Sequence, residues 1–374
     1  MKNKLLMKYP SSWWGAKWRE ALPSGNGPIG AAVYGAVHEE TVMLTHEDLW
    51  HMVVTQELPD VCSMLPEVRR LLFDRMVHAA DHMIADELTR RGYDPDIGYP
   101  LPLGDFKVKM PVARGFSNYS RGIDMETGEV FVNWHDNGVD YQRKLFVSRA
   151  DDIVVMEISS QGGDLEAGFS FDIHDPLDAR TLHHGDSPLP QAIEKVTTEN
   201  KFIRYAALND DGNDFGAVAR IITPTGVVEA DAEHVHVSGA DKILVVIKLF
   251  THEGRQEAWP RLEEELDSLC LDYQVLLAPH AELHGEMFNR VELDLGAGEA
   301  EHEVCNEQLL LDAYQGEAPT AMVEKMWSYG RYLLISSSRE GGHPCHLYGN
   351  WCGEYRGYWA FNMANENLQM IYWQ

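Results

Sequence analysis

Large aromatic side chains alternate with amides and carboxylates over residues 343–374, the last part of the chain. A helix buried in a core would instead show apolar residues at i, i+3, i+4 and i+7. A pyranose ring offers an apolar C–H face for stacking and a rim of hydroxyl groups, and an amide supplies both hydrogen-bond donors and an acceptor. The segment therefore fits a sugar-binding site, although aromatic-rich segments also build cores. The candidate residues are Trp351, Glu354, Trp359, Asn365, Asn367, Gln369 and Trp373.

Two groups of residues contain metal-binding side chains, but neither has a recognisable ligand spacing. His78 and His82 lie one helical turn apart with no third ligand in view, which is typical of a solvated helix face. The other group matches no zinc motif and consists of His343, Cys345, His346 and Cys352. We therefore predict no bound metal and no cofactor.

Gly25, Gly27 and Gly30 have the spacing of a dinucleotide-binding loop. That motif requires a strand before the glycines and alternating strands and helices after them. Here the first predicted strand, IGAAVYGAV, follows the glycines, and no such alternation is seen. The small residues of this strand instead predict that another part of the chain packs closely against it.

The net charge of the chain limits the kinds of partner that it can bind. The 374 residues include 31 basic and 59 acidic ones, a formal net charge of −28. Long-range repulsion would oppose nucleic acid and anionic membranes, so we predict that neither is a partner. A neutral oligosaccharide is not repelled by this charge. The sequence leaves the oligomeric state open.

The cysteine count and the first residues bear on the compartment. Five cysteines, mostly far apart, imply no disulfide framework and favour a reducing environment. The apolar run in MKNKLLMKYPSSWW is too short for the core of a signal peptide. No stretch approaches the length of a membrane span. We therefore predict a cytoplasmic protein.

Hydrophobic periodicity predicts a β-rich chain with helices at defined places. Residues 100–250 contain short alternating runs, separated by turn clusters such as QGGD, NDDGND, PTG and SGAD, which indicate an antiparallel sandwich. Helical spacing over 65–92 predicts one helix that ends at Gly92. Helical spacing also recurs over 255–278 and 318–338.

Two segments at opposite ends of the chain resemble glycoside hydrolase family 95, the 1,2-α-L-fucosidase family. Asn365 to Trp373 is similar to the family's Asn-x-Asn-x-x-Met-x-Tyr-Trp segment, and it follows Gly349-Asn350-Trp351 and Trp359 as in the family. Residues 280–296 resemble the family's linker, with counterparts at His284, Phe288 and Arg290-Val291, and YGRYLLISSSR resembles its first long barrel helix. The other end matches at Trp18, Ala21 to Gly27, Gly30-Ala31, Leu44 and Glu47 to Trp50.

This resemblance implies a multidomain β + α architecture. Residues 1–275 would form a large antiparallel β-sandwich, a super-sandwich, with the helix 65–92 inserted in it. Residues 276–300 would be a helical linker. Residues 301–374 would be the start of an (α/α)6 catalytic barrel, truncated inside its second helix.

The resemblance also implies inverting hydrolysis of terminal α-L-fucosyl or α-L-galactosyl residues. Asn365 and Asn367 would orient the attacking water, while the general acid and a polarising aspartate lie later in the family's barrel. We therefore expect these 374 residues alone to be inactive. Glu366 is a poor candidate for the acid, because neighbouring helical residues point about 100° apart. Met363 stands where many members have His or Thr, which leaves the sugar open.

Two other functions remain open from the sequence. The chain could be a carbohydrate-binding or interaction module without catalysis, or a relative of the family 65 phosphorylase-type enzymes. A barrel that ends in mid-helix favours a truncated enzyme, since a module should stop at a domain boundary.

Overall fold

The computed structural model describes residues 2–11, 17–51, 56–93, 98–175, 191–197, 202–355, 357, 359–360 and 365–373. The chain divides into two compact units. One unit contains Met1–Trp50 and Tyr99–Gln374, and the other contains His51–Gly98. The domain boundaries at 275 and 300 remain predictions.

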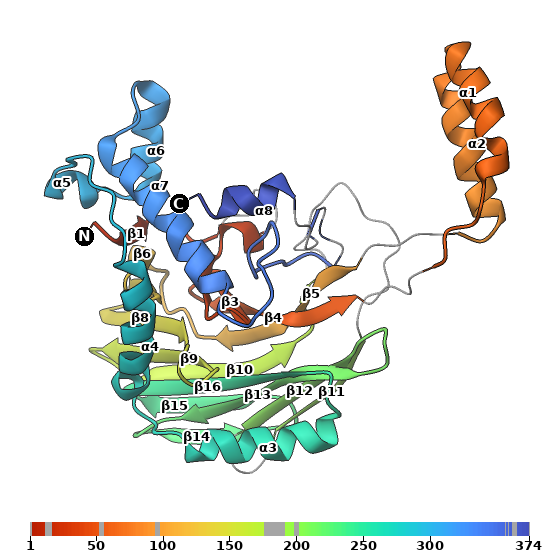
Figure 1. Ribbon diagram of the computed structural model, residues 1–374. Coiled ribbons are helices and arrows are strands. Elements are labelled where there is room, and N and C mark those ends of the chain that lie inside the picture. The colour runs from red at the N-terminus through yellow and green to blue at the C-terminus, as the bar shows by residue number, and fades with distance from the viewer. Residues whose placement is uncertain are drawn as a thin grey trace. The chain divides into compact units, whose positions relative to one another are not determined.

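Two antiparallel sheets form the larger unit (Figure 1), as the alternating sequence predicted. Every strand pairing whose register is described is antiparallel. The nine-stranded sheet has the order β1 (Lys4–Met7), β6 (Ser117–Asp124), β7 (Glu129–Asp136), β8 (Val139–Val147), β9 (Val154–Gln161), β16 (Lys242–Thr251), β13 (Asp214–Ile222), β12 (Phe202–Leu208) and β11 (Gln191–Thr197). The seven-stranded sheet has the order β14 (Val227–Ala230), β15 (Val235–Ala240), β10 (Leu165–Asp172), β5 (Tyr99–Lys109), β4 (Glu39–His51), β3 (Ile29–Val33) and β2 (Leu22–Gly25).

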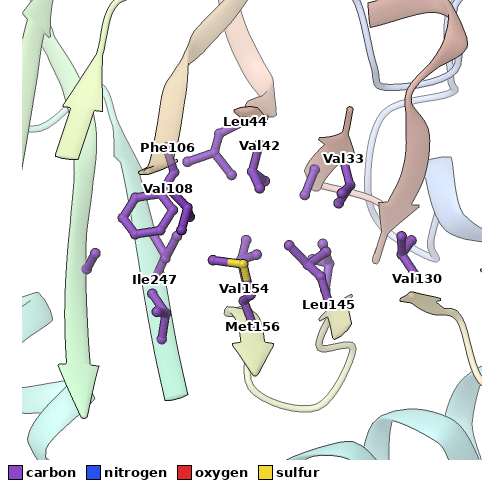
Figure 2. Packing of buried hydrophobic residues seen from close by; sticks show 14 of the residues in the cluster. Val33, Val42, Leu44, Phe106, Val108, Val130, Leu145, Val154, Met156 and Ile247 are labelled. Carbon is purple, nitrogen blue, oxygen red and sulfur yellow. The ribbon is translucent and has the colours of Figure 1, made fainter. Parts of the chain in front are cut away.

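The main hydrophobic core lies between the two sheets (Figure 2). Alternate residues of a strand point to opposite faces, so each strand contributes every second side chain to this core. In β7, for example, Val130, Val132 and Trp134 are buried, whereas Phe131 and Asn133 between them are half-buried. Other buried members of the core are Val33, Val42, Leu44, Phe106, Val108, Leu145, Val154, Met156 and Ile247.

Two helices cover part of the outer face of the nine-stranded sheet. α3 (Arg255–Ser268) lies across β12, β13 and β16, and α4 (Tyr273–Phe288) contacts β9 (Figure 1). The helical spacing over 255–278 is therefore divided between two helices. Asp272 begins the second one, because its side chain accepts hydrogen bonds from the backbone N–H groups of Gln274 and Val275.

The C-terminal helices follow these two. They are α5 (Glu299–His302), α6 (Asn306–Gln315), α7 (Thr320–Ser337) and the short α8 (Glu366–Ile371). Two 3₁₀ helices lie earlier in the chain, at Lys17–Glu20 and Cys62–Met64. The predicted helix over 318–338 is confirmed by α7. Within the described residues, no helix is long and apolar enough to cross a membrane.

The smaller unit corrects the prediction of one helix over 65–92. It is a helical hairpin made of α1 (Leu65–Phe73) and α2 (Val77–Arg90). Arg75 adopts a positive φ of 58° and turns the chain between the helices. Val68, Leu71 and Ala80 are buried against one another across the hairpin. Helical periodicity continues through both helices, because a three-residue turn interrupts it only briefly.

Candidate functional site

Hydrogen bonds join the second half of α7 to the β-sandwich. They fix the point from which the following segment, residues 338–355, continues. Tyr332 is fully buried, and its hydroxyl donates to the Pro23 carbonyl at 2.6 Å. The backbone N–H of Gly27 donates to the Ser336 carbonyl at 3.0 Å. The Arg149 guanidinium donates to the carbonyls of Ile335 and Ser338. The chain therefore leaves α7 beside the β2–β3 turn.

Trp351 lies against the first strands of the seven-stranded sheet and is only 6% exposed. Its Nε1 donates to the Ser24 carbonyl at 2.9 Å. A Cβ atom at Gly30 would lie 3.0 Å from the Trp351 ring and 2.4 Å from Thr45 Oγ1. A Cβ at Gly25 would also meet the Trp351 ring, at 3.1 Å. The small residues of β2 and β3 thus admit this ring, as the sequence predicted.

Asn350 ties the same segment to the β2–β3 turn. Its Nδ2 donates to the carbonyls of Gly27, at 2.7 Å, and Pro28, at 3.0 Å. Its own carbonyl accepts from Thr45 Oγ1 at 2.5 Å. Because the amide is buried with its hydrogen bonds made inside the protein, Asn350 holds the backbone in place.

Glu354, a predicted sugar-binding residue, is only 1% exposed and forms an ion pair with Arg19. The Arg19 guanidinium donates to Oε1 at 2.6 Å and also lies over the Trp18 ring. The other oxygen, Oε2, has no hydrogen-bond partner among the described residues. Glu354 thus contacts the Trp18–Arg19 segment instead of solvent.

A buried His174–Asp105 pair holds Gly353, the residue before Glu354 in the chain. His174 Nδ1 lies 2.8 Å from Asp105 Oδ1, and its Nε2 lies 3.0 Å from the Gly353 carbonyl. Both ring nitrogens face acceptors, so each N–H that the ring carries can donate to one of them. Burial alone would raise the pKa of Asp105, but the charges and hydrogen bonds of His174 and Lys107 lower it below its usual value.

Asn365 and Asn367 line a small hollow together with Trp359 and His346. The cavity volume is about 10 Å³, which is near the minimum needed to hold one water molecule. The remaining lining residues are Cys345, Leu347, Leu368 and Ile371. The structure thus brings three of the seven predicted site residues to one place.

Local backbone geometry determines how these groups face the hollow. Asn365 is the N-cap of α8, and its side chain accepts from the Asn367 N–H at 3.1 Å. Asn367 itself is exposed. Trp359 has a positive φ of 65° and is 45% exposed. A left-handed conformation of a bulky residue costs on the order of 1–3 kcal/mol, and such strain is concentrated at functional sites.

His346 is a candidate that the sequence suggested only as a doubtful metal ligand. Burial lowers its pKa to about 4, so the ring is neutral near pH 7. Its Nδ1 accepts from the Tyr348 N–H at 3.3 Å, which places the ring proton on Nε2. His346 is therefore an N–H donor beside Asn365 and Asn367. No spacing rule predicts this, because only the fold joins residues 346 and 365.

A second small cavity shares Cys345 and His346 with the first and extends to Glu47. The Glu47 carboxylate accepts from the backbone N–H of His343 at 3.1 Å, and burial raises its pKa. His343 Nε2 also lies 3.2 Å from Asp48 Oδ1. The Leu-x-x-Glu-Asp-Leu-Trp motif at the end of β4 thus contacts the loop that carries His346.

The structure separates the other predicted residues from this hollow. Gln369 is exposed, and Trp373 is 77% exposed at the end of α8. Neither residue lines the cavity at Asn365. In the described part of the chain, no three His, Cys, Asp or Glu side chains are close enough together to hold a metal ion.

A β-sandwich joined by helices to a segment of rings and amides fits a carbohydrate-active enzyme, and comparison with known families gives the same class. Residues 5–253 match the family described as glycosyl hydrolase family 65, N-terminal domain. Residues 272–374 match the glycosyl hydrolase family 95 catalytic domain. The chain therefore belongs to the family described as glycosyl hydrolase family 65, N-terminal domain, and its last part is similar to the family 95 catalytic domain.

Individual relatives are consistent with this assignment. The chain is 26% identical to alpha-L-fucosidase 2 of Arabidopsis thaliana, over 95% of this chain and 45% of that protein. It is 24% identical to a probable alpha-fucosidase A of Aspergillus niger, over 94% of this chain and 45% of that protein. The chain thus spans about half the length of these relatives.

A solved structure shares the fold. A putative kojibiose phosphorylase from the human microbiome aligns with 90% of this chain and 42% of its own, at a TM-score of 0.53 and 9% identity. At this identity the likeness concerns the fold alone.

Proposed function

We propose that this chain supplies the β-domain and the first catalytic helices of an inverting glycoside hydrolase. Its substrates would be oligosaccharides that end in an α-L-fucosyl or α-L-galactosyl residue. The observation that carries this proposal is the one-water hollow lined by Asn365, Asn367, Trp359 and His346. The names of the two relatives, both fucosidases, support the sugar class.

Each group at the hollow has a role that its chemistry allows. Inversion requires a water molecule held on the face of the sugar opposite the leaving oxygen. The carbonyl oxygens of Asn365 and Asn367 are suited to accept hydrogen bonds from that water. The neutral His346 donates from Nε2, to the water or to a sugar hydroxyl. The exposed Trp359 ring offers a stacking surface for the apolar face of the pyranose.

The buried residues act at a distance from the sugar. Trp351 and Asn350 hold the loop on β2 and β3, and Glu354 holds it on Arg19. We therefore propose that Trp351 and Glu354 support the site without contacting the substrate. Gln369 and Trp373 remain proposed substrate contacts, because their side chains are exposed on the same short segment as Asn367.

The proposed compartment is the cytoplasm. All five cysteines are free, as in a protein kept in a reducing environment. The proposed partner is the oligosaccharide substrate, and the strong negative charge disfavours nucleic acid and anionic membranes.

The proposed reaction is tested by its stereochemistry. A protein that extends residues 1–374 with the remaining part of a family 95 catalytic domain is mixed with aryl α-L-fucoside, aryl α-L-galactoside or 2′-fucosyllactose. The anomeric proton of the first sugar released is then followed by NMR. We expect the β-anomer from at least one substrate, because a single displacement inverts the configuration. Release of the α-anomer, or no turnover of all three substrates, would contradict the proposal.

A further inference from the structure

The outer face of the nine-stranded sheet consists of two unlike parts. One part is apolar and lies under α3 and α4, where Phe146, Val155 and Leu244 are buried. The other part lies on β6, β7, β8 and β9, and it includes the polar side chains of Ser120, Asn133, Gln142 and Ser159. These four side chains are half-buried. A surface that packs against another element is usually apolar, so such packing does not explain the polar side chains of this part.

Neighbouring strands place the polar side chains in a row. The register pairs Ser120 with Asn133, Asn133 with Gln142, and Gln142 with Ser159. Gln142 Nε2 donates to Asn133 Oδ1 at 2.9 Å, and Asn133 Nδ2 donates to Ser120 Oγ at 3.4 Å. This chain of hydrogen bonds fixes which way each amide points, and it leaves Gln142 Oε1 facing outward as an acceptor.

The row borders a hollow of about 230 Å³ on this face. Its polar lining consists of Asn118, Asn133, Asp140, Gln142, Ser159 and Gln161. Within the part of the chain that is described, the side chains of Asn118, Ser159 and Gln161 make no hydrogen bond to protein. The hollow therefore holds oriented donors and acceptors that only water or a ligand satisfies.

The floor of the hollow is held by the core beneath it. Trp134 and Tyr141 are cross-strand partners, and their rings stack with centroids 5.2 Å apart. Both rings pack with the main core, because alternation along a strand turns them away from Asn133 and Gln142. The hydrogen-bonding groups are thus mounted on a rigid sheet, which lowers the entropy lost on binding.

The charge of the lining selects the class of ligand. Asp140 is its one ionisable carboxylate, and one of its oxygens lies 2.7 Å from Nδ1 of His135. The other lining residues are amides, Ser159, Trp134 and Tyr141. The amides and the Ser159 hydroxyl both donate and accept hydrogen bonds. A neutral polyhydroxyl ligand satisfies such a set without the cost of burying an unpaired charge.

We propose that this hollow is a second sugar site, which binds one pyranose ring of an oligosaccharide. It shares no lining residue with the hollow at Asn365, so it acts as a separate holding site on the β-domain. Its volume equals roughly eight water molecules at about 30 Å³ each. That is below the range of about 300–1,000 Å³ for drug-sized ligands, which favours a single ring and a weak, millimolar Kd.

Saturation-transfer NMR on the 374-residue chain measures the binding directly. The probes are lactose, cellobiose and 2′-fucosyllactose, each titrated to obtain a Kd. The double variant Asn133→Ala with Gln142→Ala removes the oriented amides, and Ser159→Tyr fills the hollow with a residue that strands accept readily. Gln256→Ala, an exposed amide on α3, is the matched control, and Asn367→Ala tests the other hollow.

We expect at least one probe to bind, and both the double variant and Ser159→Tyr to weaken it at least about tenfold. Gln256→Ala and Asn367→Ala should leave that Kd unchanged. Binding that is weakened by Asn367→Ala alone would overturn this site while supporting the proposed function. The absence of saturable binding by all three probes would also overturn it, as would binding that both variants retain. Circular dichroism checks that each variant folds. If the double variant does not fold, the Kd measured with Ser159→Tyr alone tests the proposal.

Discussion

Residues 343–355 and 365–373 belong to one aromatic and amide-rich stretch, yet the structure uses them in opposite ways. In the first segment Trp351, Asn350 and Glu354 are buried, and their polar atoms bond to the sandwich or to Arg19. In the second segment Asn367 and Trp373 are exposed. The difference shows that similar composition serves anchoring in one place and remains open for a ligand in the other.

The comparison gives a rule for interpreting such stretches. A ring or amide whose hydrogen bonds are made by distant backbone groups holds the fold, as Trp351 does with Ser24. A ring or amide that stays exposed beside a hollow is a candidate for binding, as Trp359 and Asn367 are. Substitutions of the buried residues in 343–355 should therefore mainly lower stability, whereas substitutions of the exposed residues in 365–373 should mainly affect ligand binding.

The largest expected effect on stability is that of Trp351→Ala. The substitution removes a buried ring and its Nε1 hydrogen bond, and it should lower the free energy of unfolding by about 3–5 kcal/mol. Chemical denaturation measures this loss. Trp373→Ala, in the exposed segment, is the matched control and should change stability by less than about 0.5 kcal/mol. Equal losses in the two variants would remove the distinction between the segments.

Acid should weaken the anchored segment through His346. Burial lowers the pKa of His346 in the folded chain to about 4, from an ordinary value of 6.5. Between these values the unfolded chain binds a proton that the folded chain does not, so stability falls as the pH drops from 6.5 to 4. The loss is on the order of 3 kcal/mol.

Unfolding free energies measured across this pH range test the effect. His346→Gln should flatten the pH dependence by that amount, whereas Gln256→Ala, at an exposed amide that does not titrate, should leave it as it is. An unchanged slope in His346→Gln would show that His346 binds a proton equally well in the folded and the unfolded chain. His280 and His284, whose pKa values burial lowers to about 3 and about 4, contribute to the acid loss in both variants.

Gly30→Ala tests how closely Trp351 packs on β3. The added methyl group would crowd Thr45 Oγ1 and the Trp351 ring, so the free energy of unfolding should fall by about 1–3 kcal/mol. Gly298→Ala adds the same group in open space and serves as the control. Thermal and chemical denaturation of both variants give the comparison. Equal stability of the two would mean that the ring moves aside without cost.

The smallest effect concerns the capping role of Asn365. Asn365→Ala removes the acceptor for the Asn367 N–H and should destabilise α8 by about 1 kcal/mol. Asn365→Asp keeps that acceptor and should preserve the helix. Amide hydrogen exchange at α8 separates the two variants. Equal exchange in both would show that the cap does not support the helix.

Much of the fold could be predicted from the sequence, because its signals are local. Alternating runs predicted the sandwich, and helical spacing predicted α7. The hairpin at 65–92 was predicted as one helix, since a short turn barely disturbs the period. α4 likewise runs past residue 278, because its polar and apolar residues give no clear stop before Asn289.

The candidate site was less predictable, because burial depends on distant partners. The residues next to Trp351 in the sequence do not predict that its ring packs against Gly25 and Gly30. They also do not predict that the Trp359 ring stays partly exposed. His346 drew attention only as a metal ligand, and its neutral ring beside Asn365 follows from the fold. The amide row on β7 and β8 looks like an ordinary solvated strand face until the register aligns it.

The turnover number of Asn367→Ala tests the central claim most directly. The side chain of Asn367 is exposed and lines the hollow, and its backbone N–H keeps the bond to Asn365 when the side chain is removed. The substitution is made in a protein that extends residues 1–374 with the remaining part of a family 95 catalytic domain, and fucose released from 2′-fucosyllactose is followed. Gln256→Ala is the amide control. We predict that kcat falls at least about a hundredfold in Asn367→Ala and stays unchanged in the control, because the attacking water loses its position. An unchanged kcat in Asn367→Ala would contradict the assignment of this hollow as the site of the water.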